Sequence, residues 1–340
     1  MLKNLTITGF RTFRELRVDR LTRVNLFVGT NNAGKTSILE AAEVLTTGEI
    51  HGLLEGPLRR GEEILARDER ERGFKTEIDP SHLFYGHVLK PDVSFSISGD
   101  GGMQRFVHCQ VSLESASLFV NLKSHFKDDR FPISPDGGLQ IGYRVVNMFL
   151  LPPPPVNFLG SEAIERDRLG ELWDEVVLEP EEEGVIEALR IIDPRIERIS
   201  FIGDSPRAPR NIYLKLADSE QRLPLGSMGD GLKRLLALAL HLFSAKGGFL
   251  LIDEIDTGLH HTVMVNMWKL VIETARRLDV QVFATSHSLD CVHALAWVRE
   301  QNPDLASDVT MHRVEKDATK TVAFSSDELL IAAQNHLELR

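Results

Sequence analysis

The residues with the clearest capacity for chemistry lie at positions 29–37, in the stretch GTNNAGKTS. Gly29 and Gly34 let the backbone curl so that successive N–H groups can point at phosphate oxygens. Lys35 can reach terminal phosphates as a point charge, and Thr36 can offer its hydroxyl to Mg²⁺. The pattern G-x-x-x-x-G-K-[ST] is complete, so it predicts a nucleotide-binding loop. This loop comprises Gly29, Thr30, Asn31, Asn32, Ala33, Gly34, Lys35, Thr36 and Ser37.

Two adjacent carboxylates, Asp253 and Glu254, follow the apolar run FLLI at 249–252. The run predicts a buried strand, whose end would present Asp253 to the Mg²⁺ shell as a hard oxygen ligand. Glu254, one position further on, is placed to polarise an attacking water as a general base. Alone this is a weak signal, but together with the phosphate-binding loop it predicts hydrolysis.

A second apolar run, VQVFATSHS at 280–288, ends in His287. A histidine at a strand end beside the phosphates could hydrogen-bond the terminal phosphate and the attacking water. A lone histidine is more often structural, so this prediction depends on the Asp-Glu strand that precedes it. We therefore expect Glu254, His287 and Lys35 to be the catalytic residues.

Another glycine-rich segment, PLGSMGDG at 224–231, precedes a long helix with an apolar face. Its Ser227, Gly229 and Gly231 would lie at a second helix N-terminus that can bind an anion. A monomer with one nucleotide has no obvious use for two such sites. The alternative is a glycine loop that simply leads into a core helix.

The elements around these residues fit the chemistry. Strands are predicted at 2–8 and 24–28, and a helix follows the loop from 35 to 47, which is the context that a phosphate loop requires. From about 47 to 160 the pattern changes to a charged helical stretch and several strands, which predicts an inserted lobe. The helical stretch is 53–73, the strands are 92–98, 105–113 and 141–151, and PPPP at 152–155 closes the lobe as a stiff connector. Beyond it we expect a helix at 179–192, a hairpin at 198–218, and a hairpin and helix after 309.

Composition limits the class of protein. The 340 residues favour about two domains, or one with an insertion, and 42% hydrophobic residues can form a sizeable core. No run approaches the roughly 18 apolar residues of a membrane helix, and the start MLKNLTITGF has no signal-peptide core. Two cysteines, Cys109 and Cys291, make no disulfide framework or metal motif. A reducing cytoplasm without a membrane partner is expected.

A net charge of −11 opposes binding of nucleic acid by the general surface. A local basic strip near the start has arginines at three-residue steps. It is either a nucleic-acid contact or a solvated edge whose arginines pair with nearby acids. The strip consists of Arg11, Arg14, Arg17, Arg20 and Arg23.

In order along the chain, GTNNAGKT, GSMGDGLKR, FLLIDE, DTGLH and ATSH resemble the Walker A, signature, Walker B, D-loop and H-loop of ABC-type ATPase heads. The opening ITGFRTF and the segment DEIDTGLHH are more similar to the soluble branch of RecF, SMC-type heads and OLD-family nucleases than to transporters. The resemblance is specific over about 1–46 and 224–292. It implies an α/β P-loop NTPase of the ABC-ATPase head type, with a mixed sheet flanked by helices. The nucleotide-binding domain would comprise 1–46 and 196–340, and the inserted lobe 47–195.

The resemblance also implies roles by position. Lys35 and Thr36 would hold the phosphates of ATP and Mg²⁺, Asp253 would hold the metal through water, and His287 would sense the γ-phosphate. Ser227 and Gly229 would contact the γ-phosphate held by a second copy, which makes ATP the glue of a homodimer. Arg11 matches an arginine that lies near the nucleotide in SMC-like heads. The Q-loop glutamine has no clear match; Gln110 and Gln140 are candidates by order, and PVNFLGSE at 155–162 is another.

These features favour a cytoplasmic ATPase whose ATP-bound dimer, or a higher oligomer, regulates a separate effector. In this branch such an effector is often a nuclease of phage defence or genome maintenance, so any contact with nucleic acid would be indirect. Three alternatives remain open: a RecF-like clamp that binds DNA directly, a transporter ATPase subunit, and a nucleotide-dependent scaffold with little turnover. The opening FRTF and the Gly-Leu-His segment oppose the transporter.

Overall fold

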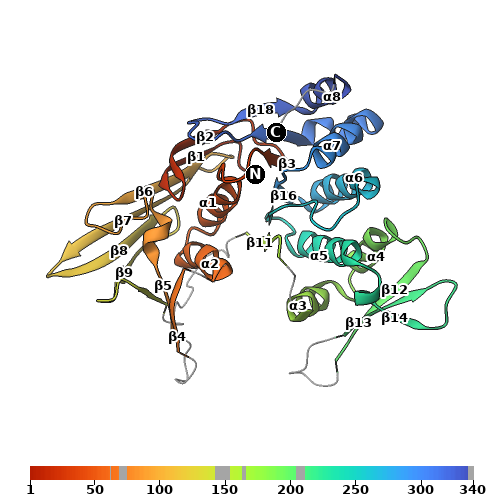
Figure 1. The fold of residues 1–340 in the computed structure, drawn as a ribbon, viewed down its shortest axis with the longest axis horizontal. Coiled ribbons are helices and arrows are strands. Elements are labelled where there is room, and N and C mark those ends of the chain that lie inside the picture. Colours follow the sequence, from red (N-terminus) through yellow and green to blue (C-terminus); the bar gives the residue numbers. More distant parts are fainter. Residues whose placement is uncertain (62, 69–74, 142–153, 163–165, 204–210, 336–340) are drawn as a thin grey trace. The chain divides into compact units, whose positions relative to one another are not determined.

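The computed structural model describes the chain except residues 62, 69–74, 142–153, 163–165, 204–210 and 336–340 (Figure 1). The chain divides into two compact units. Unit 1 contains Met1–Leu21, Asn31–Pro154 and Val314–Val322. Unit 2 contains Thr22–Thr30, Pro155–Arg313 and Ala323–Arg340.

Unit 2 is built on a six-stranded sheet with the order β11-β15-β16-β3-β17-β18. The pairs β11–β15, β15–β16, β16–β3 and β3–β17 are all parallel. The inner strands β15, β16 and β3 are fully buried, which explains their unbroken apolar sequences. The strands are β3 (Val24–Val28), β11 (Val156–Leu159), β15 (Phe249–Ile252), β16 (Gln281–Thr285), β17 (Val309–Arg313) and β18 (Val322–Ser325).

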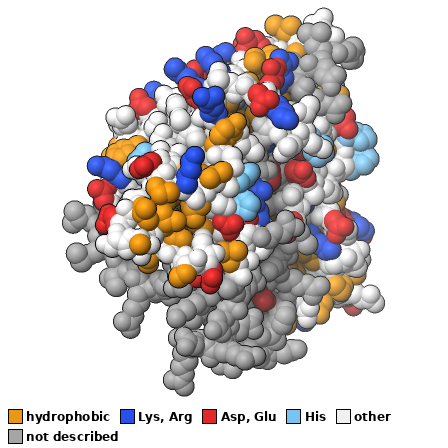
Figure 2. Space-filling model, turned by 60° about the vertical axis from the view of Figure 1, so that its left-hand side comes forward, with side chains coloured by type: hydrophobic (Ala, Val, Ile, Leu, Met, Phe, Trp, Pro, Cys, Tyr) orange, Lys and Arg blue, Asp and Glu red, His pale blue; other side chains and the backbone are white. Residues whose placement is uncertain are grey.

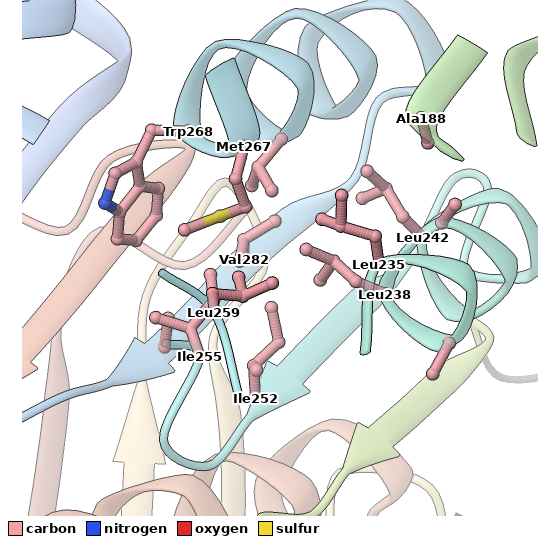
Figure 3. Packing of buried hydrophobic residues seen from close by; sticks show 14 of the residues in the cluster. Ala188, Leu235, Leu238, Leu242, Ile252, Ile255, Leu259, Met267, Trp268 and Val282 are labelled. Atoms are coloured by element: carbon pink, nitrogen blue, oxygen red, sulfur yellow. The ribbon is translucent and has the colours of Figure 1, made fainter. Parts of the chain in front are cut away.

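Helices cover this sheet and bury a large hydrophobic core. Helix α5 packs against α6, α6 against α7, and α7 against α8 (Figure 1). Figure 3 shows the core between α5, α6 and the sheet, where Leu235, Met267 and Val282 meet. The helices of unit 2 are α3 (Arg166–Val176), α4 (Glu181–Arg190), α5 (Asp230–Ser244), α6 (His261–Leu278), α7 (Leu289–Gln301) and α8 (Ser326–Gln334). A small antiparallel sheet and two 3₁₀ helices complete the unit: β12 (Ile196–Ile202), β13 (Asn211–Leu216), β14 (Arg222–Pro224), η2 (Leu225–Ser227) and η3 (Pro303–Asp308).

Unit 1 is built on an antiparallel sheet with the order β2-β1-β6-β7-β8-β9, against which helix α1 packs. A second, three-stranded sheet has the order β10-β5-β4. The strands are β1 (Leu5–Phe10), β2 (Phe13–Val18), β4 (Ile64–Asp68), β5 (Lys75–Ile78), β6 (Ser94–Gly99), β7 (Arg105–Glu114), β8 (Ser117–Ser124), β9 (Asp128–Pro132) and β10 (Leu139–Ile141). The helices are α1 (Lys35–Thr47), α2 (Ile50–Arg60) and the 3₁₀ helix η1 (Pro80–Leu83).

The structure confirms the α/β class and most of the expected elements. β3, β15 and β16 match the predicted buried strands, and α1 begins directly after the glycine loop. The charged stretch 53–73 is not one helix, because α2 ends at Arg60 and strand β4 begins at Ile64. Gly61 follows α2 with φ +69, a conformation that suits glycine and ends the helix. Residues 142–151 of the expected strand, the first two prolines of the PPPP connector and the turn at 204–210 lie outside the described residues.

The two units divide the chain at other positions than the predicted domain boundaries. Strands β1 and β2, expected in the nucleotide-binding domain, pair with the lobe strands in unit 1. Helices α3 and α4, expected in the lobe, pack on α5 in unit 2. Sequence-distant partners complete both cores, and the local pattern does not reveal such partners. Among the described helices, none is long and apolar enough to cross a lipid bilayer.

Candidate functional site

Three of the segments predicted to take part in the chemistry lie at one edge of the parallel sheet in unit 2. Neighbouring strands β3, β16 and β15 all point the same way, so the segments that follow them lie at the same edge. These segments are Gly29–Thr30, Ser286–His287 and Asp253–Glu254. Backbone hydrogen bonds join them: the Ser286 N–H donates to the Phe27 carbonyl over 3.1 Å. The strand order thus brings together residues that lie more than two hundred positions apart in the sequence.

Thr285 links the two carboxylate residues. Its hydroxyl donates to Asp253 Oδ1 over 2.6 Å and accepts the N–H of Glu254 over 2.9 Å. Thr285 is completely buried at the end of β16, so its rotamer is fixed by packing. One hydroxyl therefore sets both the direction of the Asp253 carboxylate and the position of the Glu254 backbone.

Glu254 has an unusual backbone, with φ +50 in the left-handed region that non-glycine residues rarely adopt. Its carbonyl accepts hydrogen bonds from Arg234 Nη2 over 2.8 Å and from the Thr257 N–H over 3.0 Å. Its Oε1 lies 3.7 Å from His287 Nδ1, and both side chains are partly exposed. The backbone is thus held on both sides while the carboxylate faces solvent beside His287.

Arg234 is a buried arginine in the second turn of α5, with 5% of its surface exposed. It donates to three backbone carbonyls: those of Gly160 over 2.6 Å, Asp253 over 2.9 Å and Glu254 over 2.8 Å. Burial lowers the pKa of Arg234 to about 10, and the nearby acids Asp256, Asp253 and Glu254 oppose this change. Arg234 is therefore charged at neutral pH. It joins α5, the helix that follows the glycine segment 224–231 (the signature helix), to the residues at the end of β15, the strand that precedes Asp253 and Glu254 (the carboxylate strand).

The packed core also anchors the segment that follows Glu254. Ile255 and Leu259 are buried, and Figure 3 shows both side chains directed into the core toward Val282 and Met267. Gly231 on α5 packs closely on this segment, because an added Cβ would lie 3.0 Å from the Gly258 carbonyl oxygen. This close approach is sufficient reason for glycine at position 231, which was predicted to bind nucleotide.

The phosphate-binding loop continues from Asn31 in unit 1, where it leads into α1. Gly34 has φ +95, and an added Cβ would lie 2.4 Å from Phe13 Cζ and 2.8 Å from Thr12 Oγ1. No side chain caps the N-terminus of α1, and no acidic residue lies in its first turn. Lys35 begins this helix, so its backbone is suited to an anion.

The second glycine segment lies on the surface of unit 2. Ser227 and Gly229 are exposed, and no side chain caps α5 after Gly229, whose φ is +90. The Ser227 hydroxyl donates to the Pro224 carbonyl over 2.7 Å. Asp230 in the first turn of α5 pairs with Lys233 at 2.8 Å, which reduces its repulsion of an approaching anion. The segment is accessible to a second molecule.

Comparison with known proteins identifies the class. Residues 1–92 match the model of the "AAA ATPase domain" family, and residues 151–290 match that of "AAA domain, putative AbiEii toxin, Type IV TA system". An "ATP/GTP phosphatase" of Helicobacter pylori is 24% identical over 357 residues, which cover 93% of each chain. Together these likenesses identify the protein as an ATPase.

Solved structures show the fold of this ATPase. An SMC head bound to the C-terminal winged-helix domain of ScpA superposes with a TM-score of 0.56 at 14% identity, over 95% of this chain and 97% of that one. An SMC head from Pyrococcus furiosus, bound to the C-terminal domain of ScpA, gives 0.56 at 12% identity over 99% of each chain. A shorter likeness, 46% identical over 48 residues, joins the ATPase to RecF of Thioalkalivibrio sulfidiphilus, and it covers 14% of this chain and 13% of that protein. The fold is therefore that of an SMC-type ABC-ATPase head.

The oxygen donors of the ATPase suit Mg²⁺. In the described residues no three His, Cys, Asp or Glu side chains gather as a metal cage. Mg²⁺ does not require such a cage, because it is usually held by one or two carboxylates, substrate phosphates and water. Asp253, oriented by Thr285, and the hydroxyl of Thr36 are hard donors of this kind.

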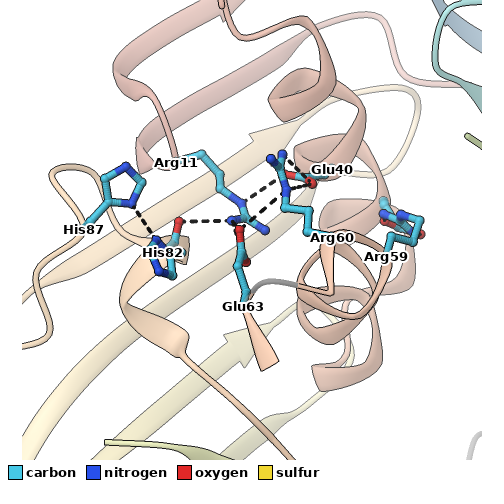
Figure 4. A network of polar contacts seen from close by, with 8 residues as sticks. Arg11, Glu40, Arg59, Arg60, Glu63, His82 and His87 are labelled. Carbon is cyan, nitrogen blue, oxygen red and sulfur yellow. Dashed lines mark hydrogen bonds and ion pairs between the residues drawn. The ribbon is translucent and has the colours of Figure 1, made fainter. Parts of the chain in front are cut away.

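Arg11 of the ATPase takes part in an ion-pair network within unit 1 (Figure 4). It is 4% exposed, and its guanidinium lies 3.0 Å from a Glu40 oxygen and 2.7 Å from a Glu63 oxygen. Arg60 also pairs with Glu40, at 2.9 Å. To contact a nucleotide, Arg11 would have to exchange these carboxylates for phosphate, so that role remains a prediction.

Two of the other four arginines of the strip pair with acidic side chains. Arg17 pairs with Asp19 at 2.8 Å, and Arg23 pairs with Asp279 at 3.0 Å. Figure 2 shows basic and acidic side chains intermixed over the described part of one face. Arg14 is exposed. These contacts agree with the interpretation of a solvated edge.

The three candidate Q-loop segments lie in different elements. Gln110 is in β7 and Gln140 in β10, both in unit 1. The segment 155–162 contains β11, which pairs with β15, and the Asp253 N–H donates to the Leu159 carbonyl over 2.8 Å. Within unit 2, segment 155–162 therefore adjoins the strand that ends before Asp253 and Glu254.

Sequence reasoning missed Thr285 and Arg234 as site residues. Thr285 had a signal, since it is a hydroxyl residue at the end of the strand that neighbours Asp253. Arg234 had little signal, because an arginine within a helix that contains Leu232 and Leu235 looks like a solvent-facing residue. Arg234 is buried because the residues that follow β11 and β15 lie against α5, and the sequence alone does not predict this packing.

Proposed function

We propose that this ATPase dimerises around ATP and that the closed dimer controls a separate effector protein. The observation that carries the proposal is the second helix N-terminus in unit 2. Ser227 and Gly229 are exposed, and no side chain caps the N-terminus of α5 beside them. A surface that binds the γ-phosphate of a partner's ATP requires both features. Two copies would then contribute complementary halves of each nucleotide site, and a higher oligomer could form from such dimers.

Each chain contributes its own hydrolytic groups. Lys35 and the backbone of residues 29–37 would hold the phosphates. Thr36 and Asp253 would each donate an oxygen to Mg²⁺, which would neutralise charge on the phosphates. Glu254 accepts a proton from the attacking water, and His287 hydrogen-bonds the γ-phosphate and that water. The 3.7 Å between Glu254 Oε1 and His287 Nδ1 supports this pairing.

The effector and the setting are inferred from the relatives. The two SMC heads are each described in complex with a domain of ScpA, which supports a partner protein for this fold. The family description over 151–290 names a toxin of a toxin–antitoxin system, which supports a role in defence. A nuclease would suit such a role, and contact with nucleic acid would then be made through it. Two buried free thiols, Cys109 and Cys291, fit a reducing cytoplasm.

The Glu254→Gln variant tests the dimer and the general base together. The amide keeps the shape of the side chain but cannot accept the proton, so ATP should bind and remain unhydrolysed. We expect phosphate release to fall about 10²- to 10⁴-fold. With ATP and Mg²⁺, light scattering should give twice the 38.2 kDa mass of one chain.

Glu273→Gln is the matched control, because Glu273 is a partly exposed acid on α6 that pairs only weakly with Lys269. It should hydrolyse ATP at the wild-type rate and accumulate no extra dimer. A Glu254→Gln protein that binds ATP, stays monomeric and releases phosphate normally would refute both parts of the proposal.

A RecF-like clamp that binds DNA directly is the second candidate, favoured by the local likeness to RecF. It predicts that replacing Arg14 and Arg17 with alanine weakens DNA binding, and that binding falls steeply with salt. Fluorescence anisotropy with a labelled duplex at several salt concentrations would measure this. Equal, salt-insensitive signals for both proteins would remove this candidate.

A further inference from the structure

The Glu254 backbone makes a contact with Arg234 that the proposed proton transfer does not require. Arg234 lies on the helix that begins just after Ser227 and Gly229, yet its guanidinium binds the carbonyls of Asp253 and Glu254. Nothing in helix α5 requires a buried charge at this point, because the residues around it are Leu232, Leu235 and Leu236. Placing a guanidinium there costs desolvation, and its hydrogen bonds and the nearby carboxylates of Asp256, Asp253 and Glu254 offset that cost.

The three carbonyls belong to two segments of the chain. Gly160 follows β11, while Asp253 and Glu254 follow β15. The Glu254 peptide is therefore fixed from both directions, by Thr285 at its N–H and by Arg234 at its carbonyl. A residue at φ +50 keeps that conformation only where its surroundings impose it.

We propose that Arg234 is a positioning residue that holds Glu254 in its working conformation and links it to the signature helix. A shift of α5, such as contact with a partner's nucleotide would cause, moves the guanidinium and with it the carbonyls of Asp253 and Glu254. The inference rests on the proposed role of Glu254 as general base. It adds a route by which the signature segment of a chain regulates that chain's own hydrolysis.

Arg234→Met tests the link, because methionine fills most of the volume and removes every donor. We expect ATP binding within about threefold of wild type, since Arg234 is not assigned any contact with nucleotide. The kcat should fall by about 10- to 100-fold, the loss expected when a catalytic group is displaced by about 1 Å. Arg234→Lys keeps the charge but not the fork of donors, so its kcat should lie between that of wild type and that of Arg234→Met.

Arg190→Met is the matched control. Arg190 also donates to a backbone carbonyl, that of Ile196 over 2.9 Å, and it lies in unit 2 away from the carboxylate strand. Its kcat should equal that of wild type. If Arg234→Met does not fold, the lysine variant carries the test, and a folded Arg234→Lys with wild-type kcat would overturn the proposal.

A double-mutant cycle separates positioning from a general structural effect. If Arg234 acts through Glu254, adding Arg234→Met to Glu254→Gln should slow single-turnover hydrolysis by less than about threefold more. If the effects of the two substitutions on the rate are fully additive, or if Arg234→Met has a normal kcat, Arg234 does not act through Glu254. Neither result would contradict the role of Glu254 as general base. Normal hydrolysis by Glu254→Gln alone would instead refute the proposed function.

Discussion

Thr285 and Gly34 are the two residues whose surroundings give the sharpest tests of the proposed nucleotide-binding residues. Thr285 orients Asp253 and holds the Glu254 backbone through one buried hydroxyl. Gly34 lies where a side chain would meet Phe13 and Thr12. Thr285 can be changed by removing its hydroxyl alone, and Gly34 by adding a single methyl group.

Thr285→Val removes the hydroxyl and keeps the branched shape. Leaving the Asp253 carboxylate and the Glu254 N–H without this partner should cost about 1–3 kcal/mol, or roughly 10- to 100-fold in kcat/KM. Thr285→Ser restores the hydroxyl and should recover most of that loss. Phosphate release measured across a range of Mg²⁺ concentrations would show this, and equal rates for valine and serine would contradict the role.

Gly34→Ala should abolish ATP binding. The new Cβ would lie 2.4 Å from Phe13 Cζ, and left-handed backbone costs about 1–2 kcal/mol more for alanine than for glycine. Gly61→Ala is the control, because Gly61 also has positive φ but no atom within 4 Å of the added Cβ. Isothermal titration with ATP should show binding only for the control, and tight binding by Gly34→Ala would refute the steric argument.

At the scale of elements, helix α5 connects the signature segment with the core. Its buried face includes His241, which hydrogen-bonds the Ala237 carbonyl at 2.8 Å. Burial lowers the pKa of His241 to about 4, so the folded protein keeps this imidazole neutral. An unfolded chain binds a proton there below its ordinary pKa of about 6.5.

The sign of the effect on stability follows from proton binding. Between pH 6.5 and about 4 the unfolded state binds more protons at His241, so the free energy of unfolding falls as pH falls through this window. The full shift corresponds to about 3 kcal/mol. Urea unfolding at pH 7 and pH 5 should show a smaller loss of stability for His241→Leu than for wild type. An identical loss in both proteins would exclude this contribution.

The local sequence pattern predicts some of the strands and helices but not how they pair. Strands β3, β15 and β16 are unbroken apolar runs next to glycine or acidic residues, so their position and type follow from local pattern. The pairing of β1 with β6 does not, because the partners lie about ninety residues apart and either strand could pair elsewhere. Stretch 53–73 looked helical from its charges, but Gly61 and the β4–β5 pairing outweigh that propensity.

At the scale of the whole molecule, the motifs could be assigned from sequence because each one is short and contiguous. The links between them could not. Arg234 contacts Asp253 and Glu254 only after β11, β15 and α5 have packed. Arg11, which follows β1, contacts Glu63, which lies between α2 and β4. Such contacts depend on tertiary neighbours that no local pattern specifies.

The central claim is that ATP is shared between the loop of one chain and the signature segment of another. Mixing two inactive variants tests it most directly. Lys35→Ala removes the phosphate-binding charge, and Ser227→Arg places a bulky side chain on the signature surface. Each variant alone, and either one mixed with the Lys35→Ala/Ser227→Arg double variant, should release almost no phosphate.

An equimolar mixture of the two single variants should recover about a quarter of the wild-type rate. About half of randomly formed dimers are mixed, and each of these has one complete site of two. Phosphate release measured after the variants have exchanged partners gives the answer. A rate equal to the sum of the separate variants would mean that the chain does not complete its nucleotide site with a second copy.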